Sequence, residues 1–253
     1  MFTALKNFLL YIRHIPGRVY NYFSFSSSAW GILFNPFYFA RKELYQFVKK
    51  NGAMLSGKVL DAGCGTKPYE KLIPCESYIG LEYDTDENRQ NKNADFFYDG
   101  HQFPFEDSSF DSVLCNQVFE HVFTPDEFMS EIARVLRPGG KLLITVPFVW
   151  DEHEQPFDFG RYTSYGIKSM LERHGFTILE QNKTCNDFSA ISQLYTAFIF
   201  KKISGRNILI TLPLFFLLIV PANLCGLILK WILPKNNDLY LDNVILAEKN
   251  THV

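Results

Sequence analysis

Hydrophobic and polar positions between residues 57 and 180 alternate between short apolar runs and stretches with apolar residues at helical spacing. The spacing predicts helices over Pro125–Leu136 and Tyr165–His174, which Pro138-Gly139-Gly140 and Gly175 end. The apolar runs predict strands at Lys58–Ala62, Tyr78–Glu82, Ala94–Tyr98, Asp111–Cys115, Lys141–Val146 and Phe176–Glu180, with a seventh at Asn243–Glu248. Strands that alternate with helices predict an open, doubly wound α/β sheet with helices on both faces.

A long apolar segment separates the sixth strand from the seventh. Its centre, Ile208–Leu233, has no acid and one base, Lys230, and it exceeds the about 20 residues that span a bilayer. Because both strands belong to one sheet, the chain must leave and return on the same side. We expect a break at Pro221-Ala222-Asn223, which makes each half too short to span. The prediction is a helical hairpin that dips into one leaflet or lies in the interface; the alternative is a buried helical pair, over the sheet or in a dimer interface.

This pattern divides the chain into three parts. Residues 1–50 form an N-terminal helical leader, residues 51–183 with 241–250 form the α/β domain, and residues 184–240 form the apolar helical insert. The leader is basic and aromatic, and the first acid of the chain is Glu43. Its apolar run Phe8–Ile12 is too short for a signal peptide, so we expect a membrane-surface segment or a helix that caps the domain.

Composition narrows the classes of partner and compartment. The formal net charge is −2, so no basic field favours nucleic acid. The five cysteines form no CxxC pair, which favours a reducing compartment and no structural metal. We therefore expect a cytoplasmic protein, at the cytoplasmic face of a membrane if the insert binds lipid, with no metal. The oligomeric state is not indicated.

A glycine turn follows the first predicted strand, in the run Val59–Thr66 (VLDAGCGT). Gly63-Cys64-Gly65 lets the backbone turn tightly and approach a ligand. The carboxylate of Asp61, just before the turn, suits a ligand with an ammonium group and would repel a pyrophosphate. Together with the missing third glycine of GxGxxG, it argues against a dinucleotide.

Polar residues also follow the next three strands. Glu82, with Tyr83 after it, can accept hydrogen bonds from both hydroxyls of a ribose. The other two pairs are Asp99-Gly100, where an adenine amino group could be bound, and Asn116-Gln117. Strand carboxyl ends form the ligand-binding edge of an open α/β sheet, so a nucleoside site is expected there.

In the same order, these motifs resemble those of class I S-adenosylmethionine-dependent methyltransferases. The matching stretches are Val59–Thr66, Gly80–Glu82, Asp99–Phe105, Ser108–Val122 and Glu131–Pro147, which cover about half the chain and are most similar to the type 11 and ubiquinone/menaquinone-biosynthesis sequences. The resemblance implies a Rossmann-like seven-stranded sheet, bound S-adenosylmethionine and methyl transfer. It assigns Asp61, Gly63 and Gly65 to the methionine end, Glu82 to ribose, Asp99 to adenine and Asn116 to the region of the methyl donor. Lys67 departs from it, because many relatives have a further glycine there.

The segment Asp151–Gly166 holds candidates for the acceptor side. His153 has a pKa range suited to a general base, and His121 beside Glu120 is the second candidate. Arg161 and Tyr162 could hold an anionic or phenolic substrate. The alternative is a local ion pair of Asp158 with Arg161, with Tyr162 packed.

The sequence therefore predicts O- or C-methylation of a small or lipid-linked acceptor. A catalytically inactive, cofactor-binding membrane anchor or scaffold subunit is the alternative. A nicotinamide-dependent oxidoreductase is disfavoured by Asp61 and by the missing glycine.

Overall fold

A computed structural model describes residues 30–251 of the 253-residue chain. The chain divides into two compact units. One, the helical unit, is formed by residues up to Tyr45 together with Cys185–Leu239; the other, the sheet unit, is formed by Gln46–Thr184 with the segment from Tyr240 onward. Most of the predicted N-terminal leader, residues 1–29, lies outside the described residues.

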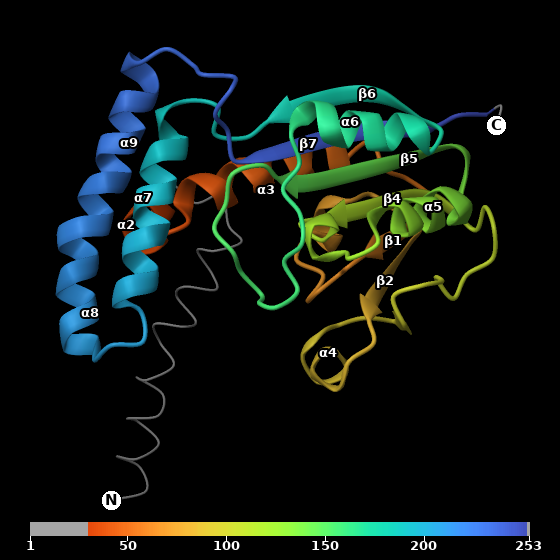
Figure 1. The fold of residues 1–253 in the computed structure, drawn as a ribbon, viewed down its shortest axis with the longest axis horizontal. Helices are drawn as coiled ribbons and strands as arrows, with labels where there is room; N and C mark the ends of the chain where they lie inside the picture. The colour runs from red at the N-terminus through yellow and green to blue at the C-terminus, as the bar shows by residue number, and fades with distance from the viewer. Residues whose placement is uncertain (1–29, 252–253) are drawn as a thin grey trace, which may run out of the picture. The chain divides into compact units, whose positions relative to one another are not determined.

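The sheet unit is built on a seven-stranded sheet with the order β3-β2-β1-β4-β5-β7-β6 (Figure 1). Its strands are β1 (Lys58–Ala62), β2 (Ser77–Tyr83), β3 (Phe96–Tyr98), β4 (Phe110–Asn116), β5 (Leu136–Pro147), β6 (Phe176–Lys183) and β7 (Asp242–Lys249). β1 to β5 pair in parallel, and β7 runs antiparallel between β5 and β6. The sequence predicted all seven strands but not the direction of β7.

The largest change in strand limits is at β5, which begins at Leu136 rather than Lys141. Pro138-Gly139-Gly140 therefore lies within the strand and does not end the preceding helix, α5 (Pro125–Val135). The register between β4 and β5 shifts there, from Phe110 opposite Leu136 to Ser112 opposite Lys141. Gly139 has a φ of 73°, which glycine adopts at little cost.

Helices cover the sheet on both faces. α5 and α6 (Ser164–Arg173) lie side by side in front of the sheet in Figure 1, and the carboxyl end of α3 (Tyr38–Gly52) lies behind it. The short elements are α4 (Asp86–Asn91), η1 (Glu70–Leu72) and η2 (Phe119–His121). The fully buried core between α5 and the sheet includes Leu60, Val113, Met129 and Ile132. The doubly wound fold is confirmed.

The helical unit contains α2 (Gly31–Phe34), the first part of α3, and α7 (Phe188–Ile203). α8 (Ile208–Leu214), a π-helical segment (Phe215–Ile219) and α9 (Val220–Ile232) follow without interruption. The predicted break at Pro221–Asn223 is therefore wrong. Pro221 lies within a helical run of 25 residues, Ile208–Ile232, two residues after its π-helical segment, and it does not end the helix. The hairpin turn instead lies at residues 204–207, between α7 and α8.

Polar side chains of this unit point inward. Asn223 Nδ2 donates to the carbonyl oxygen of Ile32 at 3.0 Å, and Ser192 Oγ donates to that of Ala222 at 2.8 Å. Lys230 pairs with Glu43. A Cβ added at Gly226 would lie 2.4 Å from Ser192 Oγ, so α9 and α7 approach through small residues.

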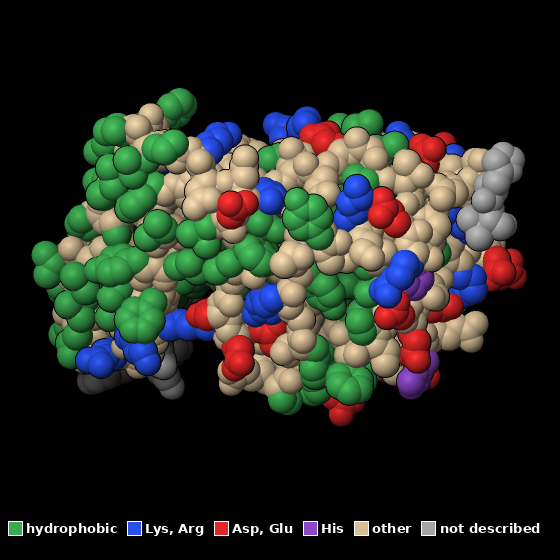
Figure 2. Space-filling model, turned by 45° about the horizontal axis from the view of Figure 1, so that its top comes forward, with side chains coloured by type: hydrophobic (Ala, Val, Ile, Leu, Met, Phe, Trp, Pro, Cys, Tyr) green, Lys and Arg blue, Asp and Glu red, His purple; other side chains and the backbone are tan. Residues whose placement is uncertain are grey.

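Large apolar side chains, in contrast, point outward from the same helices (Figure 2). The exposed ones along the run from α8 to α9 include Leu209, Leu212, Phe216, Leu217, Leu224, Ile228 and Trp231. Most of them are three, four or seven positions apart, which places them along one broad side of the helix, the apolar stripe. Among the described residues, Ile208–Ile232 is one helix long and apolar enough to cross a membrane, with a mean hydropathy of 2.4 and 17% of its most apolar window buried.

Candidate active site

The candidate site lies where β1 and β4 are neighbours, at the point where the strand order reverses. Open α/β sheets bind ligands outside the strand carboxyl ends at this point. The backbone turns sharply after β1, since Gly63 has a φ of 78° and its N–H donates to Leu81 O at 2.8 Å. A Cβ added at Gly63 would lie 2.3 Å from Cγ2 of Val118, which follows β4. The turn therefore needs glycine both for its conformation and for this close approach.

Asp61 is a buried acid at the end of β1. Its side chain accepts a hydrogen bond of 2.6 Å from the hydroxyl of Tyr78. Burial raises the pKa of Asp61 to about 7, although the Tyr78 hydrogen bond lowers it. A cationic group placed beside this carboxylate would favour its ionised form.

Glu82, at the end of β2, reaches the glycine turn. Its Oε2 accepts from the N–H of Gly65 at 2.9 Å, and its Oε1 accepts from its own neighbour, Tyr83 N, at 3.3 Å. An ionised carboxylate has about four acceptor sites, so two remain for other donors. Gly65 has a φ of 53°, and a Cβ added there would meet no atom within 4 Å. The backbone at Gly65 is therefore open to a ligand.

The loop after β3 carries Asp99 and Gly100. Asp99 Oδ1 accepts from His101 N at 3.0 Å, which closes a local turn and lowers the pKa of Asp99. A Cβ added at Gly100 would lie 3.0 Å from the ring of Tyr83, so the segments after β2 and β3 approach closely here. Asp99 also lines an open groove with Asp84 and the residues 102–106.

Arg134 and Glu131 of α5 hold that loop, a role that was not predicted from the sequence. Arg134 donates to the carbonyl oxygens of Phe103 and Phe105 at 3.1 and 2.8 Å, and Glu131 Oε2 accepts from Phe103 N at 2.7 Å. Their spacing of one helical turn predicts the ion pair between them, but not their contacts with the loop.

Asn116 and Gln117 end β4 and are fixed by the neighbouring strand. Asn116 Oδ1 accepts from Thr145 Oγ1 at 2.8 Å, and Gln117 N donates to Thr145 O at 3.1 Å. Cys64 is buried beside the turn, and desolvation raises the pKa of its thiol to about 12, so it is an unreactive packing residue.

Lys67 occupies the position where the resembling sequences often have glycine. Its φ is 54°, a left-handed conformation that glycine adopts more easily. The side chain of Lys67 forms an ion pair with Asp95 at 2.5 Å, and Asp95 also accepts from Gly80 N at 2.7 Å. Lysine thus occupies a backbone site suited to glycine and ties the turn to the segment before β3.

The loop after β5 is fixed by Arg161. Its guanidinium binds both carboxylate oxygens of Asp158, at 2.5 and 2.7 Å, and the carbonyl oxygens of Trp150, Asp151 and Gly160. These contacts use the five N–H donors that arginine has. The ring of Tyr162 packs on Phe119, with centroids 5.0 Å apart. The structure therefore shows the local ion pair and the packing that the sequence left as the alternative for these two residues.

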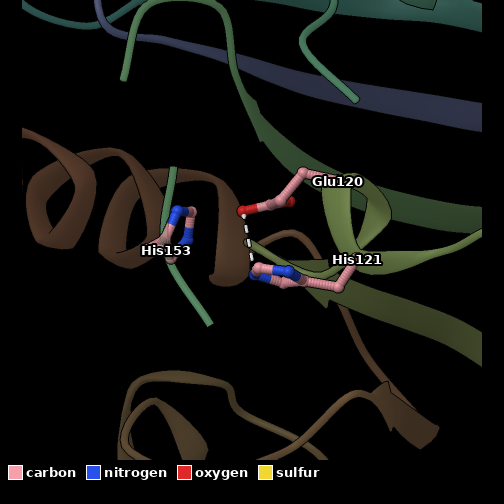
Figure 3. Close-up of side chains that lie close together, drawn as sticks. All are labelled: Glu120, His121 and His153. Atoms are coloured by element: carbon pink, nitrogen blue, oxygen red, sulfur yellow. Dashed lines mark ion pairs between the residues drawn. The ribbon is translucent and has the colours of Figure 1, made fainter. Parts of the chain in front are cut away.

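His153 of this loop lies close to Glu120 and His121 of η2 (Figure 3). Their candidate ligand atoms lie within 4.8 Å of one another, and the two imidazole centroids are 4.8 Å apart. The side chain of Glu120 is fully buried, and neither of its carboxylate oxygens has a hydrogen-bond partner. Burial raises the pKa of Glu120 to about 8. The two histidines predicted as rival bases are thus neighbours.

Comparison with known proteins identifies the fold and the domain. Residues 60–144 match the family described as "Methyltransferase domain". Residues 60–144 therefore form a methyltransferase domain. This confirms the family resemblance and S-adenosylmethionine as its cofactor.

A "Probable S-adenosylmethionine-dependent methyltransferase" of Mycolicibacterium smegmatis is 32% identical over 133 residues, which are 47% of this chain and 52% of that protein. A "Fatty-acid O-methyltransferase" of the same species is 31% identical, over 41% of this chain and 42% of that protein. The chain thus spans about half the length of these relatives. A structure of Haemonchus contortus phosphoethanolamine N-methyltransferase 2 with S-adenosylhomocysteine has a TM-score of 0.52, 20% identity and coverage of 87% of this chain and 56% of that one. At this identity, the structural likeness concerns the fold alone.

Proposed function

We propose that this protein transfers a methyl group from S-adenosylmethionine to a lipid-linked or small acceptor, by O- or C-methylation. One observation carries the proposal: the glycine turn and two acids, Asp61 and Glu82, converge at the switch point of the sheet, where Glu82 accepts from Gly65 N. Acids there suit a ligand with an ammonium group and a ribose and oppose a pyrophosphate.

In this proposal, four predicted positions hold the cofactor, which supplies an electrophilic methyl group on a sulfonium. Asp61 accepts from the ammonium of its methionine end, and Glu82 accepts from the ribose hydroxyls with its two remaining acceptor sites. Gly65 allows close approach because no atom lies within 4 Å of a Cβ added there. Asp99 accepts from the adenine amino group. Asn116, Gln117, Tyr83 and Gly100 shape the walls of the site.

The acceptor side is formed by the loop after β5 and by η2. His153 or His121 takes the proton from an acceptor hydroxyl or carbon, and Arg161 and Tyr162 keep the loop in place. Both histidines are partly exposed, with side-chain exposures of 30% and 17%, so an acceptor can reach them.

A lipid-linked acceptor is favoured by the helical unit. Asn223 and the Lys230–Glu43 pair face inward, whereas many large apolar side chains face outward and form an extensive exposed apolar surface. The fatty-acid O-methyltransferase relative acts on a molecule of this kind, as its name states.

We propose that the long helix lies in the membrane interface, at the cytoplasmic face. Lys201, Lys202 and Arg206 lie at the hairpin turn and are exposed, so insertion of the turn into the hydrocarbon would bury three charges at high cost. A helix lying in the interface buries its apolar stripe and leaves these charges among anionic headgroups.

Calorimetric titration of the detergent-solubilised protein with S-adenosylmethionine tests the cofactor. The parent is expected to bind, and the Asp61→Ala, Glu82→Ala variant is expected to lose binding. A radiolabelled methyl donor and fractionated membrane lipids then test the acceptor. If the folded parent does not bind S-adenosylmethionine, the proposal that the protein is a methyltransferase is contradicted, and a membrane anchor or scaffold is favoured.

A further inference from the structure

Glu120, His121 and His153 form a second cluster at the carboxyl ends of β4 and β5, separate from the residues assigned to the cofactor. η2, which follows β4, carries Glu120 and His121, and the loop that follows β5 carries His153. Two backbone hydrogen bonds join these segments, from Phe159 N and Gly160 N to the carbonyl oxygen of Glu120, at 2.8 and 3.1 Å. The cluster is therefore held by backbone contacts and does not depend on the three side chains.

Both imidazoles use the same ring nitrogen, Nδ1, for a contact outside the cluster. Nδ1 of His121 lies 2.6 Å from the carbonyl oxygen of Phe157, which can only accept, so Nδ1 carries the proton. Nδ1 of His153 lies 3.2 Å from both Asp151 O and Asp158 Oδ2, which are also acceptors. In each ring, the lone pair of the neutral imidazole is therefore on Nε2. Metal-binding histidines show this arrangement, in which an outer carbonyl or carboxylate fixes the tautomer.

Glu120 would supply a negative charge once a cation is bound beside it. Both of its oxygens are buried and have no hydrogen-bond partner, and a buried carboxylate without compensation is costly. Oε1 of Glu120 lies 3.8 Å from Nε2 of His121, so its carboxylate is directed toward the ligand nitrogen (Figure 3). Asp158 cannot take its place, because Arg161 binds both of its oxygens.

We propose that Glu120, His121 and His153 bind one divalent transition-metal ion, zinc, with at least one coordination position open. Two imidazoles and one carboxylate form a ligand set of catalytic zinc sites. Zinc bonds of about 2.0–2.2 Å place tetrahedral ligand atoms roughly 3.3 Å apart, so side-chain rotations must contract the cluster from its 4.8 Å span. Both histidines are partly exposed, which leaves a path for the ion and for a fourth ligand.

The metal and general-base roles exclude one another for a given imidazole, because one Nε2 lone pair binds either a proton or a metal. If methyl transfer is the function, the open position would hold an acceptor oxygen, and this further step rests on the proposed function. Metal binding itself does not depend on it.

The test uses the full chain in detergent, without an affinity tag and stripped by a chelator. Equilibrium dialysis against Zn²⁺ is expected to give one ion per chain, and Co²⁺ is expected to give the visible ligand-field spectrum of a protein-bound ion. Glu120→Gln and His153→Ala are each expected to weaken binding at least roughly 10- to 100-fold, the loss seen even for outer ligand partners. His101→Ala, at a histidine with 78% side-chain exposure, is the matched control and should bind as the parent does.

Two outcomes would overturn the proposal: no saturable Zn²⁺ binding by the folded parent, or parental affinity in the folded Glu120→Gln variant, which is nearly isosteric. Asp158→Asn provides a second variant that keeps all three ligands, and its affinity should fall by a smaller factor than that of Glu120→Gln. Titration of the same samples with S-adenosylmethionine reports the cofactor site separately, so failure of either site is distinguishable.

Discussion

The hydroxyl of Tyr78 donates a hydrogen bond of 2.6 Å to Oδ2 of Asp61, in a site where Asp61 is 3% exposed. Burial destabilises the ionised form of Asp61 more than the hydrogen bond from Tyr78 stabilises it, because the pKa of Asp61 still rises to about 7. The protein thus keeps a destabilising acid at the end of β1, which is reasonable if a cationic ligand compensates it.

The first prediction concerns Asp61→Asn and pH. Because the pKa of Asp61 is raised in the folded state, its contribution to stability is greatest near pH 4 and is lost as the pH rises toward 7. A shift of about three pKa units corresponds to at most about 4 kcal/mol. At pH 8 we expect Asp61→Asn to be more stable than the parent in urea unfolding and to bind S-adenosylmethionine more weakly. An equal pH dependence of stability in both proteins would contradict the assignment.

The second prediction compares two glycines of one turn. Gly63→Ala combines a φ of 78° with a Cβ 2.3 Å from Val118, so we expect a loss of about 2–4 kcal/mol in the free energy of unfolding. Gly65→Ala has a φ of 53° but open space at its Cβ, so we expect about 1–2 kcal/mol. Both should lose cofactor binding by calorimetry.

The double variant Gly63→Ala, Val118→Ala separates the two causes at Gly63. Removal of the Val118 methyl groups should recover part of the stability, and the remainder is the cost of the left-handed backbone. No recovery would mean that Val118 does not limit the turn.

The predicted and observed folds differ where a local sequence pattern is compatible with two different structures. The strands and the glycine turn were predictable, because a short apolar run that ends in glycine or in an acid is typical of a buried strand followed by a turn. Pro221 was interpreted as a helix break, although a proline can lie inside a helix where the local geometry adjusts, as in the π-helical segment Phe215–Ile219 that precedes it. The direction of β7 has no signal in a strand that is buried on both faces.

The cluster of Glu120, His121 and His153 shows that prediction of a site from sequence is limited in a similar way. His121 and His153 were considered one at a time, as rival bases, because they are 32 positions apart in sequence. Each follows the carboxyl end of one of two adjacent parallel strands, β4 and β5, so the predicted sheet order could have brought them together. The orientation of their rings could not be predicted, since it depends on the carbonyls of Phe157 and Asp151.

A third prediction concerns the loop after β5. Arg161→Lys keeps the charge but leaves fewer donors for the Asp158 carboxylate and three carbonyls, so buried acceptors lose partners. We expect a loss of about 2 kcal/mol and faster amide hydrogen exchange across residues 151–163. Lys168→Arg, in an exposed pair with Glu172, should change stability by less than about 0.5 kcal/mol. Unchanged exchange in Arg161→Lys would show that the loop is held by other contacts.

The fourth prediction tests the membrane interface. Leu209, Leu217 and Trp231 are 78%, 68% and 82% exposed, so replacing all three with Glu leaves the interior of the helical unit intact. The parent is expected to float with anionic vesicles after density centrifugation, whereas the triple variant should remain in the aqueous fraction. Each charge opposes insertion of the stripe, and acids are also repelled by anionic headgroups. Tyr165→Glu, at an aromatic residue of the sheet unit with 83% exposure, is the control and should float as the parent does.

Flotation in high salt then distinguishes hydrophobic from electrostatic contributions to membrane binding. If the exposed stripe dominates, salt should weaken binding only slightly, because burial of apolar surface is not screened. If Lys201, Lys202 and Arg206 dominate, binding should fall steeply as salt rises, and neutral vesicles should bind poorly. A parent that stays soluble without detergent and floats with neither vesicle would instead assign the apolar stripe to a protein partner, and the acceptor would then be sought among water-soluble molecules.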